Sequence, residues 1–135
     1  MITSYGAIEI GGTKVICGVG TGPFDVAVSE AIPTTTPAET MAKVKEFFAG
    51  NAVERVGIAC FGPLEIPKGK ISKFTPKILW RGFPIRKEVE KMLNVPVALD
   101  TDVNGAAMGE RLWGAAKAVE NFVYVTVGTG IGGGV

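Results

Sequence analysis

The sequence contains no histidine and only two cysteines, Cys17 and Cys60. Without histidine, the chain cannot supply a Ser-His-Asp or Cys-His catalytic group or a histidine-based zinc site. Both cysteines lie within apolar, strand-like runs, which favours buried, reduced thiols over a disulfide framework. We therefore expect a cytoplasmic protein whose chemistry depends on other side chains.

The sequence also lacks an excess of one charge and any long apolar run. The net charge is +1 with no basic cluster, so we do not expect a nucleic acid or an anionic membrane as the main partner. No stretch approaches the roughly 18 apolar residues of a membrane span, and no signal peptide is recognisable at the start. With 135 residues, of which 47% are apolar and 20% charged, the chain is predicted to form a globular domain.

A glycine-containing turn, Gly11-Gly12-Thr13-Lys14, joins two apolar runs, Tyr5–Ile10 and Val15–Gly20. Alternating β-branched residues around a glycine pair predict a β-hairpin. Residues without side chains let an anion approach the backbone N–H groups, and the threonine and lysine add a donor and a positive charge. We expect this turn to face a phosphate. The alternative is an ordinary glycine hairpin with a surface lysine.

The rest of the chain alternates strands and helices, which predicts an α/β fold containing parallel strands. A helix is expected to begin at Thr36-Pro37 with Glu39 completing a capping box, and to end at Gly50. Further helices are expected at Pro84–Leu93 and Val103–Ala116. Strands are expected at Asp25–Ile32, Glu54–Phe61, Val95–Leu99 and Phe122–Val127, with a small hairpin formed by Leu64–Ile66 and Lys70–Thr75.

Two further features can carry chemistry. Asp102 stands where a strand ends and a helix begins, and ligands usually bind at the carboxyl ends of strands in α/β sheets. A carboxylate there can activate a hydroxyl group for phosphoryl transfer, although it can also act simply as the helix N-cap. The glycine-rich run Gly128–Gly134 follows the last strand and offers a second set of backbone N–H groups, the alternative being a flexible end of the chain.

Several motifs, in order along nearly the whole chain, resemble those of the ROK family of actin-like sugar kinases, and in particular its fructokinase-like branch. I-E-I-G-G-T-K at Ile8–Lys14 resembles the family's phosphate-binding turn, and V-T-V-G-T-G-I-G-G-G at Val125–Gly134 its second such turn. D-V-N-G-A-A-M-G-E at Asp102–Glu110 is similar to the catalytic aspartate segment. F-G-P at Phe61–Pro63 and T-P-K-I-L-W at Thr75–Trp80 resemble sugar-side segments.

The resemblance implies an RNase-H-like (actin-like ATPase) lobe, in which a mixed β-sheet is flanked by helices. Three antiparallel strands would come first and parallel strands would follow. Residues 1–118 would form the N-terminal lobe, and residues 119–135 the first strand and phosphate turn of a truncated second lobe. The family's zinc motif, its remaining sugar ligands and the adenine pocket would lie beyond Val135. Zinc is therefore expected in an intact member of the family, and the residues that bind it are not expected in this chain.

The implied function is Mg²⁺- and ATP-dependent phosphorylation of a hexose, with fructose to fructose 6-phosphate as the first expectation. Asp102 would be the general base, and Glu9, where the family more often has Asp, would reach Mg²⁺ through water. Thr101 stands where many sugar-specific members have Asn, in agreement with the fructokinase-like branch. The ATP phosphates would be lined by Gly11, Gly12, Thr13, Lys14, Gly128, Thr129 and Gly130. The sugar would be bordered by Phe61, Gly62, Pro63, Trp80 and Thr101, with a place in the core as the alternative for Trp80.

Other functions fit the same residues. The chain can be a non-catalytic half-lobe that binds sugar or phosphate and associates with itself. It can also be an actin-like ATPase without a sugar, in which Thr75–Trp80 has no ligand role. In the kinase interpretation, the strand Phe122–Val127 would lack the rest of the lobe in which it should pair and would present an unpaired edge. This predicts a homodimer formed through this strand or another sheet edge.

Overall fold

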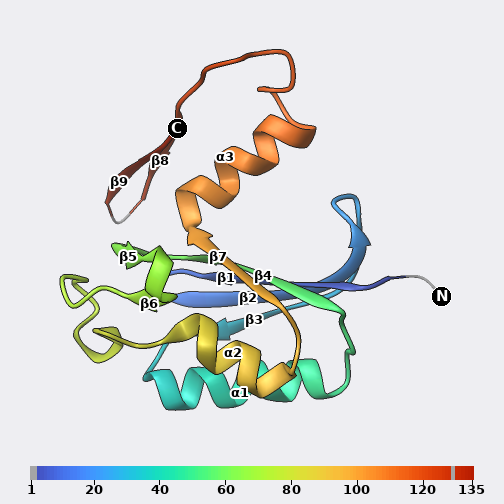
Figure 1. The fold of residues 1–135 in the computed structure, drawn as a ribbon, viewed down its shortest axis with the longest axis vertical. Coiled ribbons are helices and arrows are strands. Elements are labelled where there is room, and N and C mark those ends of the chain that lie inside the picture. Colours follow the sequence, from blue (N-terminus) through green and yellow to red (C-terminus); the bar gives the residue numbers. More distant parts are fainter. Residues whose placement is uncertain (1–2, 129) are drawn as a thin grey trace.

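The computed structural model describes residues 3–128 and 130–135. Its centre is a five-stranded sheet in the order β3-β2-β1-β4-β7 (Figure 1). The first three strands along the chain pair antiparallel, whereas β1, β4 and β7 run parallel. The mixed sheet predicted from the sequence is therefore confirmed. The strands are β1 (Tyr5–Ile10), β2 (Lys14–Gly22), β3 (Asp25–Pro33), β4 (Arg55–Cys60) and β7 (Val97–Thr101).

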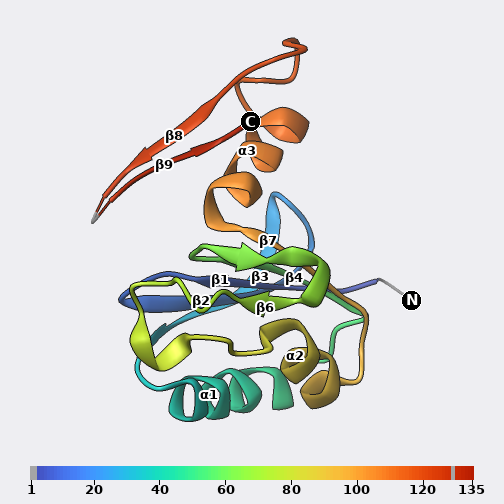
Figure 2. The ribbon, with the colours of Figure 1, turned by 60° about the vertical axis from the view of Figure 1, so that its left-hand side comes forward.

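Helices cover both faces of this sheet. Helices α1 (Pro37–Ala49) and α2 (Ile85–Leu93) lie on one face, and α3 (Asp102–Trp113) lies on the other (Figures 1 and 2). The Thr36 hydroxyl accepts the Glu39 amide N–H at 3.2 Å, as the capping motif predicts. Within the described residues, none of these helices has the length and apolar character that crossing a membrane demands.

The main hydrophobic core lies between the sheet and helices α1 and α2. In β1, Gly6, Ile8 and Ile10 are buried and the residues between them are exposed, which shows how strand alternation directs one face inward. Both cysteines are buried and free, as predicted. Burial raises the pKa of the Cys17 thiol to about 12, with a smaller contribution from the charge of Glu30.

The proline- and glycine-rich middle of the chain departs in detail from the expectation. The predicted small hairpin is present but much shorter, with β5 (Leu64–Glu65) and β6 (Lys70–Ile71) joined by a 3₁₀ turn, η1 (Ile66–Lys68). A second 3₁₀ turn, η2 (Ile78–Trp80), follows. Strand β7 begins two residues later than predicted. Because Pro96 has no N–H group to donate, regular pairing starts only after it.

The glycine-rich end of the chain is a hairpin rather than a single long turn. Strands β8 (Tyr124–Val127) and β9 (Ile131–Gly134) form a separate two-stranded sheet that lies against α3 (Figures 1 and 2). A Cβ atom at Gly134 would come within 2.8 Å of the Val103 carbonyl oxygen. Glycine is therefore required for β9 to approach the helix, and this tertiary contact explains a strand that local propensity does not favour.

Candidate active site

Three parallel strands of the sheet end at one edge and deliver the predicted site segments there. The Gly11–Lys14 turn follows β1, Phe61–Pro63 follows β4, and Asp102 follows β7. The Phe61 amide N–H donates to the Ile10 carbonyl oxygen at 2.9 Å, which continues the β1–β4 pairing beyond the strands. A cavity of about 740 Å³ opens at this edge, as expected for the carboxyl ends of parallel strands.

The start of α3 places Asp102 in this cavity. Thr101 is the N-cap residue, because its hydroxyl accepts the Asn104 amide N–H at 3.2 Å. The alternative that Asp102 caps the helix is therefore wrong, and Asp102 is instead the first helical residue. One of its carboxylate oxygens accepts the Val103 amide N–H at 2.9 Å. Among the described residues the other oxygen accepts no hydrogen bond, so it can receive a proton from a ligand.

Asp102 lies in the first turn of a 12-residue helix, the end at which the helix dipole favours acidic side chains. Cys60 lies behind the site. Its pKa is raised to about 12, chiefly by burial and then by the charge of Asp102. The thiol therefore stays protonated and is no nucleophile.

The first glycine turn is held firmly by its neighbours. The Gly11 amide N–H donates to the Lys14 carbonyl oxygen at 2.9 Å, and the Thr34 hydroxyl donates to the Gly11 carbonyl oxygen at the same distance. Gly12 and Thr13 line the cavity, whereas Gly11 and Lys14 do not. Lys14 is exposed because it already begins β2, where it pairs with Pro33. The structure thus does not bring the predicted turn lysine into the site.

The second glycine turn faces the same cavity. Gly128 and Gly130 line it, together with Thr126 of β8 and Ile131 of β9. The predicted residue Thr129 lies outside the described residues. Turns from the two ends of the chain therefore share one cavity with Asp102.

The predicted sugar-side residues divide into two groups. Phe61, Gly62 and Thr101 line the cavity, whereas Pro63 and Trp80 do not. Trp80 is only 1% exposed, and its indole N–H donates to the carbonyl oxygen of a loop residue before α1 at 2.9 Å. Trp80 therefore lies in the core, the alternative given for it, and whether it borders the sugar stays a prediction. The indole packs edge-on against Phe61, with ring centroids 5.9 Å apart, so it acts on the site only by supporting that side chain.

Sequence reasoning missed several of the described residues that line the cavity, and Lys77 is the one charged side chain among them. It lines the cavity with Pro76, and its Nζ donates a hydrogen bond to the Gly12 carbonyl oxygen. The segment T-P-K-I-L-W carries no local signal for this contact, because the burial of Thr75 and Trp80, which fixes the position of Lys77, is seen only in the structure.

Comparison with known proteins identifies the family of this chain. The family model described as the ROK family matches residues 5–135. The chain belongs to the ROK family. A fructokinase from Pediococcus pentosaceus is 43% identical over 134 residues, which is 96% of this chain and 46% of the relative. The resemblance read from the motifs is therefore confirmed.

Solved structures of ROK proteins agree with the fold. A ROK hexokinase from Thermus thermophilus superposes with a TM-score of 0.78 at 33% identity, covering 97% of this chain and 46% of that one. A ROK glucokinase from Streptomyces griseus, solved with glucose and AMPPNP, gives a TM-score of 0.82 at 32% identity, covering 98% and 43%. The predicted RNase-H-like (actin-like ATPase) fold is thereby confirmed. This ROK chain spans less than half the length of these relatives.

Two carboxylates of this ROK chain, those of Glu9 and Asp100, lie on one face of the sheet outside the lining of the cavity. Glu9 is exposed on β1 and lies opposite Ala59 of the neighbouring strand β4. Ala59 in turn lies opposite Asp100 of β7. Aligned residues share a face of the sheet, here the α3 face, since a Cβ at Gly105 of α3 would meet the Ala59 Cβ at 3.0 Å. No group of three or more His, Cys, Asp or Glu in the described part of the chain is placed to hold a metal. Mg²⁺ keeps several waters and takes one or two carboxylates plus phosphates, which this sparse set allows.

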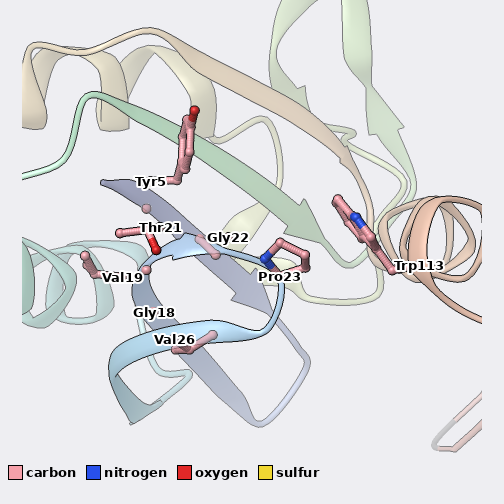
Figure 3. Close-up of a pocket in the computed structure, with 11 residues that line it drawn as sticks. Tyr5, Gly18, Val19, Thr21, Gly22, Pro23, Val26 and Trp113 are labelled. Atoms are coloured by element: carbon pink, nitrogen blue, oxygen red, sulfur yellow. The ribbon is translucent and has the colours of Figure 1, made fainter. Parts of the chain in front are cut away.

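A second cavity of the ROK chain, of about 500 Å³, lies between the sheet and the last turn of α3. Figure 3 shows Trp113 on one side of it and Pro23 of the β2–β3 hairpin on another. Tyr5, Val19 and Val26 contribute further apolar surface, and no charged side chain of the described residues lines it. Because phosphate binding needs donors and positive charge, this cavity does not compete with the first as an active site.

Proposed function

We propose that this chain is the N-terminal part of an ATP-dependent hexose kinase. Its proposed substrate is fructose, which the intact enzyme would convert to fructose 6-phosphate. The observation that carries the proposal is that Asp102 shares one cavity with both glycine turns. A proton acceptor beside two turns with free backbone N–H groups is what phosphoryl transfer to a hydroxyl group requires. The fructokinase relative at 43% identity supports the choice of sugar.

In the proposed mechanism, the free carboxylate oxygen of Asp102 accepts the proton of the attacking sugar hydroxyl. The backbone N–H groups of Gly12 and Thr13 bind phosphate oxygens from one side, and that of Gly130 binds from the other, since the Gly128 N–H already donates to the Gly130 carbonyl oxygen at 2.8 Å. Phe61 offers an apolar wall to the sugar and Thr101 a hydroxyl group. When Mg²⁺ is bound with ATP, it supplies charge neutralisation on the phosphates, and Glu9 would hold it through water.

We infer that the proposed reaction needs more chain than these residues. Residues 1–118 are proposed to form one lobe, and β8 and β9 to begin a second lobe that faces the nucleotide. The chain covers only 46% of the fructokinase relative, and the adenine pocket and the family's zinc site are assigned to the remainder. The 135 residues alone are therefore expected to bind sugar and nucleotide weakly and to turn over poorly. ATP dependence and two free, buried thiols support a cytoplasmic location.

A coupled ADP-release assay tests the proposed function. The full-length ROK protein that contains this chain should be screened against fructose, mannose, glucose and N-acetylated hexoses. Release of ADP that depends on fructose supports the assignment. A clear preference for another hexose corrects the substrate, and the absence of release with every sugar contradicts the kinase proposal.

A second candidate function is a non-catalytic half-lobe that forms dimers. It is favoured by the outer edge of β8, which pairs with no other described strand, and by the exposure of Val125 and Val127 on that strand. Light scattering over a wide concentration range checks this, with Val127→Lys as a variant that should keep the chain monomeric. A monomer at all concentrations removes the self-associating alternative.

A further inference from the structure

Lys77 supplies the positive charge of the active-site cavity. Among the described residues that line this cavity, Lys77 is the one cation and Asp102 the one anion. The Lys77 Nζ donates a hydrogen bond to the Gly12 carbonyl oxygen, within the first glycine turn. Lys14 of that turn does not line the cavity. An anion entering beside Gly12 therefore meets the ammonium group of Lys77.

The backbone of Lys77 is fixed by two buried neighbours. Thr75 is fully buried, and its hydroxyl donates to the Gly62 carbonyl oxygen at 3.2 Å and accepts the Lys77 amide N–H at 3.4 Å. On the other side, the Trp80 amide N–H donates to the Lys77 carbonyl oxygen at 2.9 Å. These contacts tie the base of the side chain to the segment that follows β4, so that the ammonium group reaches the turn that follows β1.

Gly12 leaves room for the side chain of Lys77. A Cβ atom at Gly12 would come within 3.3 Å of the Lys77 Cε, which is closer than ordinary van der Waals contact. The Gly12 carbonyl uses one of the three donors of the ammonium group, and two donors remain for a ligand. A lysine binds phosphate as a point charge, and a cleft strengthens that attraction relative to bulk water.

We propose that Lys77 binds the transferred phosphoryl group, between the first glycine turn and the hydroxyl group that faces Asp102. Without an anion, its ammonium group stays on the Gly12 carbonyl, and with one, it also contacts phosphate oxygens. Lys77 forms no covalent bond with the ligand, so its contribution is charge neutralisation and positioning. The catalytic meaning of this contact rests on the proposed kinase function, but anion binding itself is a property of these residues.

Titration of the ¹⁵N-labelled chain with inorganic tripolyphosphate tests the proposal, because this probe requires neither a sugar nor an adenine pocket. The amide signals of Gly12 and Thr13 should shift. Lys77→Met should raise the dissociation constant about tenfold, as the loss of one charge-assisted contact implies, and Lys77→Arg should restore most of the affinity. Lys73→Met is the matched control, because Lys73 lies over the ring of Phe74 in the same loop and outside the cavity.

The amide spectrum of each variant first establishes that it is folded, and Lys77→Gln replaces Lys77→Met if the latter does not fold. Equal losses in the Lys73 and Lys77 variants indicate a net-charge effect and overturn the proposal. Unchanged binding in Lys77→Met, or no shift in the wild-type chain, also overturns it. Lys77-dependent binding in a protein whose full-length form phosphorylates no sugar keeps the anion site and contradicts only the kinase function.

Discussion

The hydroxyl of Thr101 accepts the amide N–H of Asn104 at 3.2 Å and so caps helix α3. The Asp100 carboxylate accepts the side-chain amide of the same asparagine at 2.9 Å and the Thr101 amide N–H at 2.7 Å. The N-cap contact is therefore made by Thr101, whereas Asp102, the next residue, accepts only the Val103 amide N–H among the described residues and keeps its other oxygen for the proposed proton transfer. Substitutions at these two neighbouring residues can separate fold stability from the proposed catalytic role.

Thr101→Ala should destabilise the chain without removing the proton acceptor. Loss of an N-cap side chain costs about 1 kcal/mol, whereas Thr101→Ser retains the hydroxyl and should cost much less. Urea unfolding of the two variants and the wild-type chain measures the difference. Equal stabilities of the alanine and serine variants would contradict the assignment of Thr101 as the cap.

Gly134→Ala should push strand β9 away from α3. The new Cβ would lie 2.8 Å from the Val103 carbonyl oxygen, and overpacking of this kind costs about 1–3 kcal/mol. Gly133→Ala is the matched control. A Cβ atom at Gly133 would lie 3.9 Å from the Tyr124 carbonyl oxygen and 4.0 Å from a methyl group of Val123, which are ordinary van der Waals distances. Urea unfolding and amide hydrogen exchange in β8 and β9 should show a loss only for Gly134→Ala. Equal behaviour of the two variants rules out the close contact as the reason for glycine.

The two buried thiols should make the chain less stable at high pH. The pKa values of Cys17 and Cys60 are raised from 9.0 to about 12 on folding, so between these values the unfolded chain binds fewer protons than the folded chain. The stabilisation is fully present below pH 9 and is lost as pH rises towards 12.

The free energy of unfolding, measured by urea titration from pH 7 to 11, checks this effect of the thiols. Other groups also titrate in that range, so the control is the double variant Cys17→Ala with Cys60→Ala. Its stability should fall less steeply above pH 9 than that of the wild-type chain. Parallel pH curves for the two proteins would show that the thiols do not contribute.

Much of the fold could be predicted because local signals agree with the tertiary structure. The alternation of Ile8 and Ile10 with exposed neighbours marks β1, and Thr36 with Glu39 marks the start of α1. Strand β9 was not predicted, because its formation depends on a close approach to α3. A glycine-rich sequence alone does not indicate such a tertiary contact. The later start of β7 follows from Pro96, which has no backbone N–H group to donate, so that pairing with β4 begins at Val97.

The site could be predicted where a residue follows directly from a strand end, as Asp102, Gly12 and Phe61 do. Prediction failed where position depends on contacts between distant segments. Lys77 reaches a turn that lies 65 residues earlier, and no local pattern encodes that distance. The two alternatives for Trp80 could not be decided from the sequence for the same reason, because only packing determines whether an indole faces the core or a cavity.

The most direct measurement is fructose-dependent ADP release by the full-length protein, compared with its Asp102→Asn variant. Asparagine keeps the shape of the side chain but accepts a proton poorly, and Thr101 still caps α3. We predict a fall in kcat of about 10²–10⁴-fold, the usual contribution of a general base, with unfolding free energy nearly unchanged. A folded Asp102→Asn variant that releases ADP at the wild-type rate would contradict the account.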